Sequence, residues 1–225
     1  MARDLDGGAG SYLEVDTAPV TVLPMTLACW FNPDVINAND TLVFVGDKDV
    51  AGDWYLLSAS GGVAGDPVRA WSQAGGVTQA AATTTGFSAG SWFHACAVFT
   101  STTSRTAYIN GGSAATNTNS SSPATPDRLS IGRAGDSTPS SEYNGKIAEV
   151  AIWNVALTAA EVLMLSKGYC PLCVRQESLV YYNPLFGRYS PEIDLINSLE
   201  ITVVGGGVGN LPYPHPRMIY PQGSF

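Results

Sequence analysis

The stretch of residues 143–168, YNGKIAEVAIWNVALTAAEVLMLSKG, constrains the fold of this chain more than any other. In its first half, apolar residues such as Ile147 mix with polar ones such as Lys146, as in a strand with one buried face. Its second half begins a helix, because Thr158 is followed three residues later by Glu161, the spacing of an N-terminal capping box. We therefore predict a strand that turns a corner into a capped helix of about ten residues.

Two further signals frame that helix. Leu157 and Val162 have the spacing of a hydrophobic staple across the cap. Gly168 marks the predicted end of the helix, since glycine readily adopts the left-handed conformation in which many helices end.

The composition agrees with an all-β chain around that stretch. The 225 residues include 24 glycines and 14 prolines, and only 13% are charged, which suits many short strands and turns. The formal net charge is −8 and no basic run occurs, so we expect no nucleic acid and no anionic membrane surface as a partner. Because the sequence shows no apolar signal region and no apolar stretch of membrane-spanning length, we expect synthesis in the cytoplasm and no membrane insertion.

Alternating apolar residues recur in short segments along the rest of the chain. The predicted strands lie within residues 5–15, 25–33, 41–49, 53–60, 68–73, 77–85, 90–111 and 128–135. Asn110 and Gly111 form a strong hairpin signal in one of these segments, because both tolerate the positive φ of a type I′ turn.

Five segments resemble, in the same order, motifs of the laminin-G-like domains of the concanavalin A-like lectin and glucanase superfamily. LDGGAGSYLEV resembles the family's opening F-D-G-x-G-D-Y-V-E-V, and MTLACWFNP resembles F-T-I-S-A-W-V-K-P. GSWFHACAV resembles G-x-W-H-H-V-A-x-V, and RLSIGR resembles L-x-I-G-R. GKIAEVAIWNVALTAAEV resembles G-K-I-D-E-V-x-I-W-N-x-A-L-T-x-x-E-I. The resemblance implies an all-β fold: an antiparallel two-sheet jelly-roll sandwich, concanavalin A-like, with one short α-helix.

The chain divides into a sandwich domain at residues 1–206 and an irregular, proline-rich C-terminal arm at 207–225. Within the domain, residues 179–206 resemble a segment that often opens such domains. We expect this segment to supply edge strands to the same sandwich in circularly permuted fashion, or to contact a neighbouring subunit. The arm is expected to pack on its own domain or between subunits, and its candidate contact residues are Tyr213, His215, Arg217, Tyr220 and Phe225.

Aromatic residues give the candidate carbohydrate site. Trp54, Tyr55 and Trp71 lie in less constrained strands and could form a platform, because the apolar face of a pyranose ring packs on an aromatic face. Core packing remains the alternative for them. Three other tryptophans coincide with core positions of the family, namely Trp30, Trp92 and Trp153.

Acidic residues give the candidate metal site. Asp47, Asp49 and Asp53 lie in one predicted turn, where oxygen ligands for Ca²⁺ commonly collect. An ordinary acidic surface turn is the alternative, and the resemblance identifies no Ca²⁺ ligand residue by residue. We expect no cofactor, with Ca²⁺ as the one alternative.

Three further groups favour structural roles over chemistry. Cys170 and Cys173 have the spacing of a redox pair or half a zinc site, but partly buried reduced thiols are favoured over a local disulfide or zinc. Glu192 and Asp194 faintly resemble a glycosidase carboxylate pair, but a solvated turn is favoured. His94 is interpreted as a structural strand residue, and no catalytic residue is predicted.

These observations support three hypotheses for function. The first is a non-catalytic structural or adhesion protein on the exterior of a virus particle, such as a phage capsid decoration, fibre or tail-associated component. Its partners would be other protein subunits, with glycan contact secondary, and its location would be the virion, or else extracellular. The second hypothesis is a stand-alone carbohydrate-binding lectin module, and the third is a glycoside hydrolase.

Overall fold

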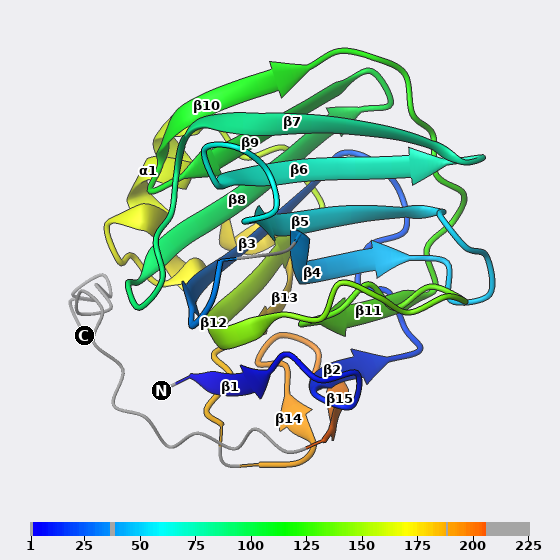
Figure 1. The fold of residues 1–225 in the computed structure, drawn as a ribbon, viewed down its shortest axis with the longest axis vertical. Helices are drawn as coiled ribbons and strands as arrows, with labels where there is room; N and C mark the ends of the chain where they lie inside the picture. Colours follow the sequence, from blue (N-terminus) through cyan, green and yellow to red (C-terminus); the bar gives the residue numbers. More distant parts are fainter. Residues whose placement is uncertain (1, 37–38, 188, 206–225) are drawn as a thin grey trace.

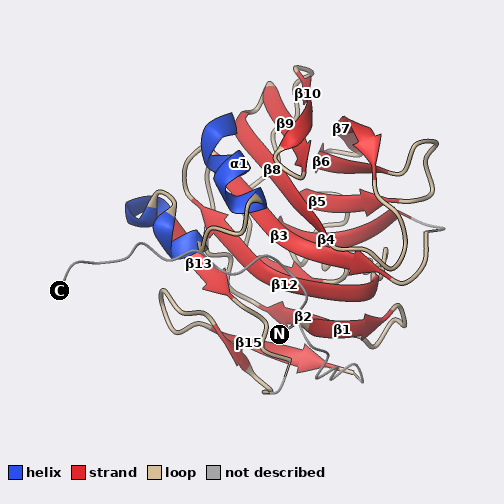
Figure 2. Ribbon diagram, turned by 90° about the vertical axis from the view of Figure 1, so that its left-hand side faces the viewer, coloured by secondary structure: helices blue, strands red, loops and turns tan. Residues whose placement is uncertain are grey.

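A computed structural model gives the architecture of residues 2–36, 39–187 and 189–205, the part of the chain that is described here. Two antiparallel sheets face each other as a sandwich, and one α-helix lies against its outside (Figures 1 and 2). This confirms the predicted all-β, two-sheet sandwich. No helix of the described residues is long and apolar enough to cross a membrane.

The first sheet, called sheet A, contains seven strands. In chain order they are β1 (Arg3–Asp6), β3 (Met25–Pro33), β8 (Phe93–Ser101), β9 (Ser104–Ile109), β10 (Gly112–Asn117), β12 (Asn144–Trp153) and β13 (Leu179–Asn183). Their spatial order is β1-β12-β3-β8-β9-β10, and β13 also pairs with β12.

The second sheet, sheet B, contains eight strands. In chain order they are β2 (Tyr12–Val15), β4 (Asn39–Gly46), β5 (Trp54–Ser60), β6 (Pro67–Ala74), β7 (Val77–Gly86), β11 (Arg128–Ile131), β14 (Glu192–Ile193) and β15 (Glu200–Val204). Their spatial order is β14-β15-β2-β11-β4-β5-β6-β7.

The main hydrophobic core lies between the two sheets. Leu27, Cys29 and Phe31 of β3 meet residues such as Val45 and Leu57 of sheet B there. The inward residues of β3 are two apart, because successive side chains of a strand point to opposite faces. The alternation that predicted this strand is therefore confirmed.

Strand β12 departs from simple alternation at Glu149. Ile147 and Val150 both pack in the main core although they are three residues apart. Glu149 between them has a φ of 56°, and the register of β12 against β3 shifts between Ala148 and Ala151. This is a β-bulge, an extra residue that redirects the following side chains.

The same edge of β12 is shared by two strands from opposite ends of the described chain. Residues 144–147 pair with β1, whereas residues 150–153 pair with β13. The segment 179–205 thus contributes to sheet A through β13, and to sheet B through β15, which pairs with β2. The arm at 207–225, with Tyr213, His215, Arg217, Tyr220 and Phe225, lies outside the described residues.

Helix α1 (Ala159–Ser166) is capped as predicted. The Thr158 hydroxyl accepts a hydrogen bond from the Glu161 N–H, and the Glu161 carboxylate accepts one from the Thr158 N–H at 2.8 Å. Val162 packs in a second apolar cluster with Trp153 of sheet A, and helix α1 lies against that sheet (Figure 2). The helix has eight residues, slightly fewer than expected, and Gly168 follows with a φ of 88°. Two short 3-10 turns continue the chain, η1 (Pro171–Cys173) and η2 (Gln176–Ser178).

Candidate functional site

A pocket of about 390 Å³ opens on the outer face of sheet B. Strands β5 and β6 form its floor, and the segment 134–141, which follows β11, forms one wall. The turn 51–52 closes another side. On the opposite side of the sandwich, α1 lies against part of sheet A (Figure 2).

The floor of the pocket is aromatic. Trp54 and Trp71 stack with their ring centroids 6.2 Å apart at an interplanar angle of 28°. Leu56 pairs with Trp71 across the two strands, and Phe44 and Ala134 complete an apolar cluster that is separate from the main core. Two of the three residues predicted for a carbohydrate site therefore border one pocket. Trp71 is half-buried there, whereas Trp54 lies beneath it and is only 7% exposed.

Tyr55, the third predicted residue, does not belong to this surface. Its ring lies in the main core, 5.2 Å from the ring of Phe99, and it is only 5% exposed. Burial raises the pKa of Tyr55 to about 12. The alternation of a strand explains the correction, because Tyr55 must face away from its neighbour Trp54.

Polar groups line the rest of the pocket, among them Ser58, Gln73 and Asp136. Asp136 accepts hydrogen bonds from the Gly52 N–H at 2.8 Å and from the Thr138 N–H at 2.9 Å. It therefore connects the wall at 134–141 to the turn at 51–52. Sequence reasoning missed these residues. Ser58 and Gln73 had a signal, since each lies an even number of residues from Trp54 or Trp71 on the same strand.

Three buried polar atoms around this pocket have no hydrogen-bond partner among the described residues. Thr41 Oγ1 belongs to a pocket-lining residue, as does Trp71 Nε1. The third is Nε of Arg69, whose guanidinium carbon lies 5.2 Å from the centre of the Trp71 ring. Burial lowers the pKa of Arg69, and the stacked guanidinium helps hold Trp71 in place. Buried polar atoms of this kind ordinarily need a partner, which here would have to be water or a bound molecule.

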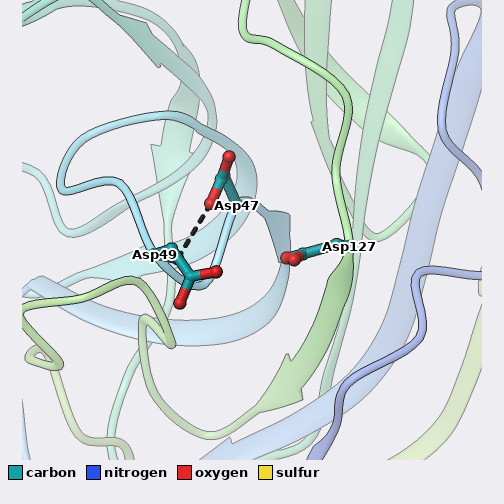
Figure 3. Close-up of side chains that lie close together, drawn as sticks. All are labelled: Asp47, Asp49 and Asp127. Atoms are coloured by element: carbon teal, nitrogen blue, oxygen red, sulfur yellow. Dashed lines mark hydrogen bonds between the residues drawn. The ribbon is translucent and has the colours of Figure 1, made fainter.

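The predicted calcium residues form a different arrangement from the one expected. One oxygen each of Asp47, Asp49 and Asp127 lie within 4.8 Å of one another (Figure 3). Asp53 is outside this group, because its carboxylate accepts a hydrogen bond from the Ala124 N–H at 2.7 Å. Asp127 was missed because it is distant in sequence.

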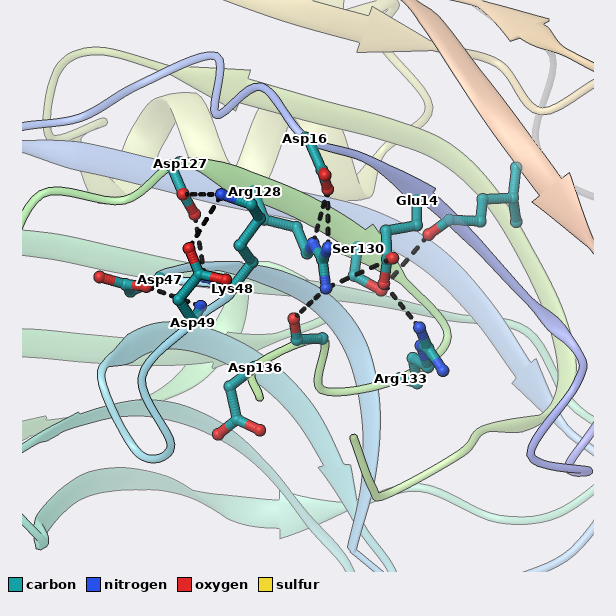
Figure 4. Close-up of polar contacts among 12 residues, drawn as sticks. Glu14, Asp16, Asp47, Lys48, Asp49, Asp127, Arg128, Ser130, Arg133 and Asp136 are labelled. Atoms are coloured by element: carbon teal, nitrogen blue, oxygen red, sulfur yellow. Dashed lines mark hydrogen bonds and ion pairs between the residues drawn. The ribbon is translucent and has the colours of Figure 1, made fainter. Parts of the chain in front are cut away.

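A lysine is already paired with two of the three carboxylates of the acidic group formed by Asp47, Asp49 and Asp127. Lys48 Nζ lies 2.7 Å from Asp127 and 3.1 Å from Asp49 (Figure 4). These carboxylates, mainly by hydrogen bonding, raise the pKa of Lys48, so its ammonium stays charged. Asp47 instead accepts hydrogen bonds from the backbone N–H groups of Asp49 and Val50. The group is therefore a poor fit for Ca²⁺, which would have to displace a bound ammonium.

Ion pairs extend across the neighbouring part of sheet B (Figure 4). Arg128 lies 2.7 Å from Asp16 and 3.4 Å from Glu14. Arg133 lies 2.9 Å from Glu14, and its guanidinium stacks over Tyr12. These charges are mutually paired, which favours a structural role for the β2–β11 half of the face.

Glu192 and Asp194 are not in a solvated turn, and that prediction was wrong. Both are almost fully buried. Glu192 accepts hydrogen bonds from Arg3 Nη2 at 2.6 Å and from the Gly187 N–H at 2.8 Å. Asp194 accepts one from the Tyr182 N–H at 2.7 Å. Both carboxylates stabilise the C-terminal strands, and neither is accessible for hydrolysis.

Cys170 and Cys173 are not joined by a disulfide. Cys170 is buried, and its thiol lies 3.9 Å from the Tyr182 hydroxyl, which in turn donates a hydrogen bond to Glu149. Burial raises the pKa of Glu149 to about 7, although the hydrogen bond from Tyr182 opposes this shift.

His94 is a strand residue of β8, in agreement with its interpretation as structural. Its ring contacts the edge of Trp30 with centroids 5.5 Å apart. Burial lowers the pKa of His94 to about 3, so the imidazole is neutral at physiological pH. Of the three tryptophans assigned to core positions, Trp153 is fully buried, Trp30 is nearly so and Trp92 is half-buried.

Comparisons with known proteins were made for the sequence and for the fold. The family model described as the concanavalin A-like lectin/glucanases superfamily matches residues 6–163. A search of curated proteins found no match to the chain.

Several solved structures share the fold. Domain 4 of AbnA, a GH43 extracellular arabinanase from Geobacillus stearothermophilus solved with arabinotriose, is 22% identical, with a TM-score of 0.61 over 73% of this chain and 76% of that one. A putative carbohydrate binding protein from Bacteroides ovatus is 19% identical, with a TM-score of 0.61 over 93% of this chain and 61% of that one. The CBM40 of the Ruminococcus gnavus IT-sialidase, bound to α2,3-sialyllactose, is 13% identical, with a TM-score of 0.56 over 65% and 84%. At these identities the likeness concerns the fold alone.

Proposed function

Because this chain belongs to the concanavalin A-like lectin/glucanase superfamily, we propose that it is a non-catalytic carbohydrate-binding module. The glycan would occupy the pocket over β5 and β6. One observation carries this proposal: the stacked Trp54 and Trp71 lie beside hydrogen-bonding groups that have no partner among the described residues.

The chemistry of the pocket suits a sugar. The apolar face of a pyranose or furanose ring packs on an aromatic surface such as Trp71, and sugar hydroxyls need both donors and acceptors. Gln73 and Asn39 offer both, and the Thr41 hydroxyl is unsatisfied. The volume of about 390 Å³ falls within the usual range of small-molecule sites. Structural neighbours that were solved with arabinotriose and sialyllactose support the same ligand class.

The pocket lacks the machinery of a glycosidase. Asp136 is the one acidic residue among the described residues that line it, and both its oxygens accept hydrogen bonds from the protein. Retaining hydrolysis needs two carboxyl groups about 5–5.5 Å apart. Some neighbours are parts of glycoside hydrolases, so binding that supports an enzyme elsewhere is compatible with this proposal.

Binding to a glycan array, followed by calorimetry with the best ligand, tests the proposal. We expect Trp71→Ala to weaken binding at least about tenfold, since a stacked tryptophan commonly dominates a small binding surface. Trp92→Ala is the matched control, because Trp92 is a half-buried tryptophan near Trp30 on the other sheet. A blank array, or equal affinity for Trp71→Ala and the parent, would contradict the proposal.

The role on a virus particle stays a prediction. The residues expected to contact other subunits, Tyr213, His215, Arg217, Tyr220 and Phe225, lie outside the described residues. Mass spectrometry of purified particles from the native source would test the predicted virion location. Absence of the chain from those particles would contradict it.

A further inference from the structure

Arg69 is the one arginine among the described residues that forms neither a hydrogen bond nor an ion pair. The other described arginines each have such a partner, namely Arg3, Arg105, Arg128, Arg133 and Arg175. The chain carries a formal net charge of −8, so acidic groups are plentiful. A cation without a counter-charge is therefore a local feature of the place where Arg69 lies.

Arg69 lies on the outer face of sheet B, beside the proposed glycan pocket. It precedes Trp71 by two residues on β6, so both side chains leave the same face of the strand. Its guanidinium carbon is 5.2 Å from the centre of the Trp71 ring. Across the strands it pairs with Ser58 of β5, which lines the pocket, and with Ala82 of β7 (Figure 1). Neither neighbour carries a charge.

The guanidinium of Arg69 keeps two donors available to a ligand. The residue is half-buried, and its Nε is buried without a hydrogen-bond partner, whereas Nη1 and Nη2 are not buried. Burial lowers the pKa of Arg69, and no carboxylate opposes that shift. Arginine nevertheless stays charged in proteins. Two parallel N–H donors on one cation are the arrangement that a carboxylate accepts in bidentate fashion.

The carboxylate that lines the pocket lies at its other end. Asp136 accepts a hydrogen bond from the Gly52 N–H, and Gly52 adjoins Gln73, since a methyl group added at Gly52 would lie 2.8 Å from Gln73 Nε2. Gln73 is four residues from Arg69 on β6, which is about 13 Å along a strand. The pocket therefore has a negative charge near Gln73 and a positive charge near Arg69.

A second pair of carboxylates lies beyond the opposite side of the pocket. Asp40 and Glu142 line a neighbouring pocket of about 520 Å³ that shares Asn39 and Ser141 with this one. Asp40 belongs to β4, which β5 separates from β6. A negatively charged group of a ligand is therefore disfavoured over β4 and favoured over β6, at Arg69.

We propose that the glycan bound in this pocket is acidic, with a carboxylate that pairs with Arg69 while its neutral groups lie toward Trp71 and Gln73. The inference rests on the proposed carbohydrate function and narrows its ligand to sugars such as uronic or sialic acids. A half-buried guanidinium attracts an anion more strongly than a fully exposed one, because less water screens the pair. The ligand would supply the counter-charge that the described residues do not.

An array of uronic-acid and sialic-acid glycans, printed beside their carboxyl-reduced counterparts, tests the inference. We expect the parent protein to bind the acidic members. Calorimetry then compares the best acidic glycan with its methyl ester, which removes the charge and keeps the ring. Esterification should weaken binding at least about tenfold. High salt should weaken binding of the acid and leave binding of the ester unchanged.

Variants of Arg69 assign the preference to this residue. Arg69→Met keeps an apolar stem beside Trp71 and removes the charge, so it should bind the acid and the ester with equal affinity. Arg69→Lys should restore part of the preference, because it keeps the charge without the planar pair of donors. Arg175→Met is the matched control and should keep the full preference, since Arg175 pairs with Glu161 of α1.

The comparison of acid and ester in the parent needs no variant, so it stands even if Arg69→Met fails to fold. Equal affinity of the parent for both would overturn the inference and leave the proposed carbohydrate function intact. An acid preference that persists in Arg69→Met, or is lost in Arg175→Met, would overturn the role of Arg69. Tighter binding of sulfated than of carboxylated glycans would overturn the choice of a carboxylate. A blank array would overturn both the inference and the proposed function.

Discussion

Asp40 and Glu192 are both buried carboxylates, but their surroundings are opposite. Glu192 is 1% exposed and meets Arg3 Nη2 at 2.6 Å. Asp40 faces a polar pocket, has no partner and lies near a second carboxylate. The difference shows that burial of an acidic group does not by itself indicate function in this protein. The missing counter-charge distinguishes Asp40 from the ion-paired Glu192.

The largest expected effect on stability comes from removing Arg3, the ion-pair partner of Glu192. Arg3→Met should lower the free energy of unfolding by about 3–5 kcal/mol, because it leaves the charge of Glu192 buried without a partner. Urea denaturation measures this change. The double variant Arg3→Met, Glu192→Met should recover much of the loss, since it removes both charges. A loss below about 1 kcal/mol in the single variant would mean that the ion pair is not what holds this edge.

Removing the charge of Asp40, which has no partner, should change the free energy of unfolding less than Arg3→Met does. It should raise that free energy rather than lower it. The pKa of Asp40 in the folded protein, about 6, lies above its ordinary 3.8, so the folded state binds this proton more tightly than the unfolded state does. The protein should therefore lose stability as the pH rises from about 4 to 7. We expect the contribution of Asp40 to this loss to be about 1–2 kcal/mol, because its carboxylate faces a pocket open to solvent screening.

Asp40→Asn should remove the contribution of Asp40 to the pH dependence of stability, as measured by urea denaturation across the same range. Glu149, with a raised pKa of about 7, contributes in the same direction in both proteins, so the difference between them isolates Asp40. Identical pH profiles for the parent and the variant would contradict the interpretation of Asp40.

The smallest effect is expected when the lysine partner of Asp49 and Asp127 is removed, so that these carboxylates lack a counter-charge as Asp40 does. Lys48→Met leaves Asp49 and Asp127 without their ammonium partner and should change stability by less than about 1 kcal/mol, because this group is at the surface. The variant should gain weak Ca²⁺ binding at the group of Asp47, Asp49 and Asp127 in calorimetry. If no binding appears, removing the lysine is not sufficient to create a cation site.

Much of the fold was predictable because its signals are local. The capping box of Thr158 and Glu161 and the alternation of Leu27, Cys29 and Phe31 each depend on residues a few positions apart. The bulge at Glu149 was not predictable, since a single extra residue in a strand leaves no clear trace in the sequence pattern.

The sites were harder to predict because they depend on distant partners. Trp54 and Trp71 were identified by residue type, and strand alternation alone could have excluded Tyr55. The contact of Lys48 with Asp127 depends on the pairing of β4 with β11, which the sequence alone does not show. Glu192 was placed in a solvated turn because its partner, Arg3, comes from the other end of the described chain.

The edge of β12 shared between β1 and β13 has a consequence for biosynthesis. As the chain leaves the ribosome, β12 finds β1 already made, so its first half can pair at once. Its second half stays without a neighbour on that side until residues 179–183 have emerged. Because chains are synthesised from the N-terminus, a nascent chain arrested shortly after α1 should expose that unpaired edge to chaperones.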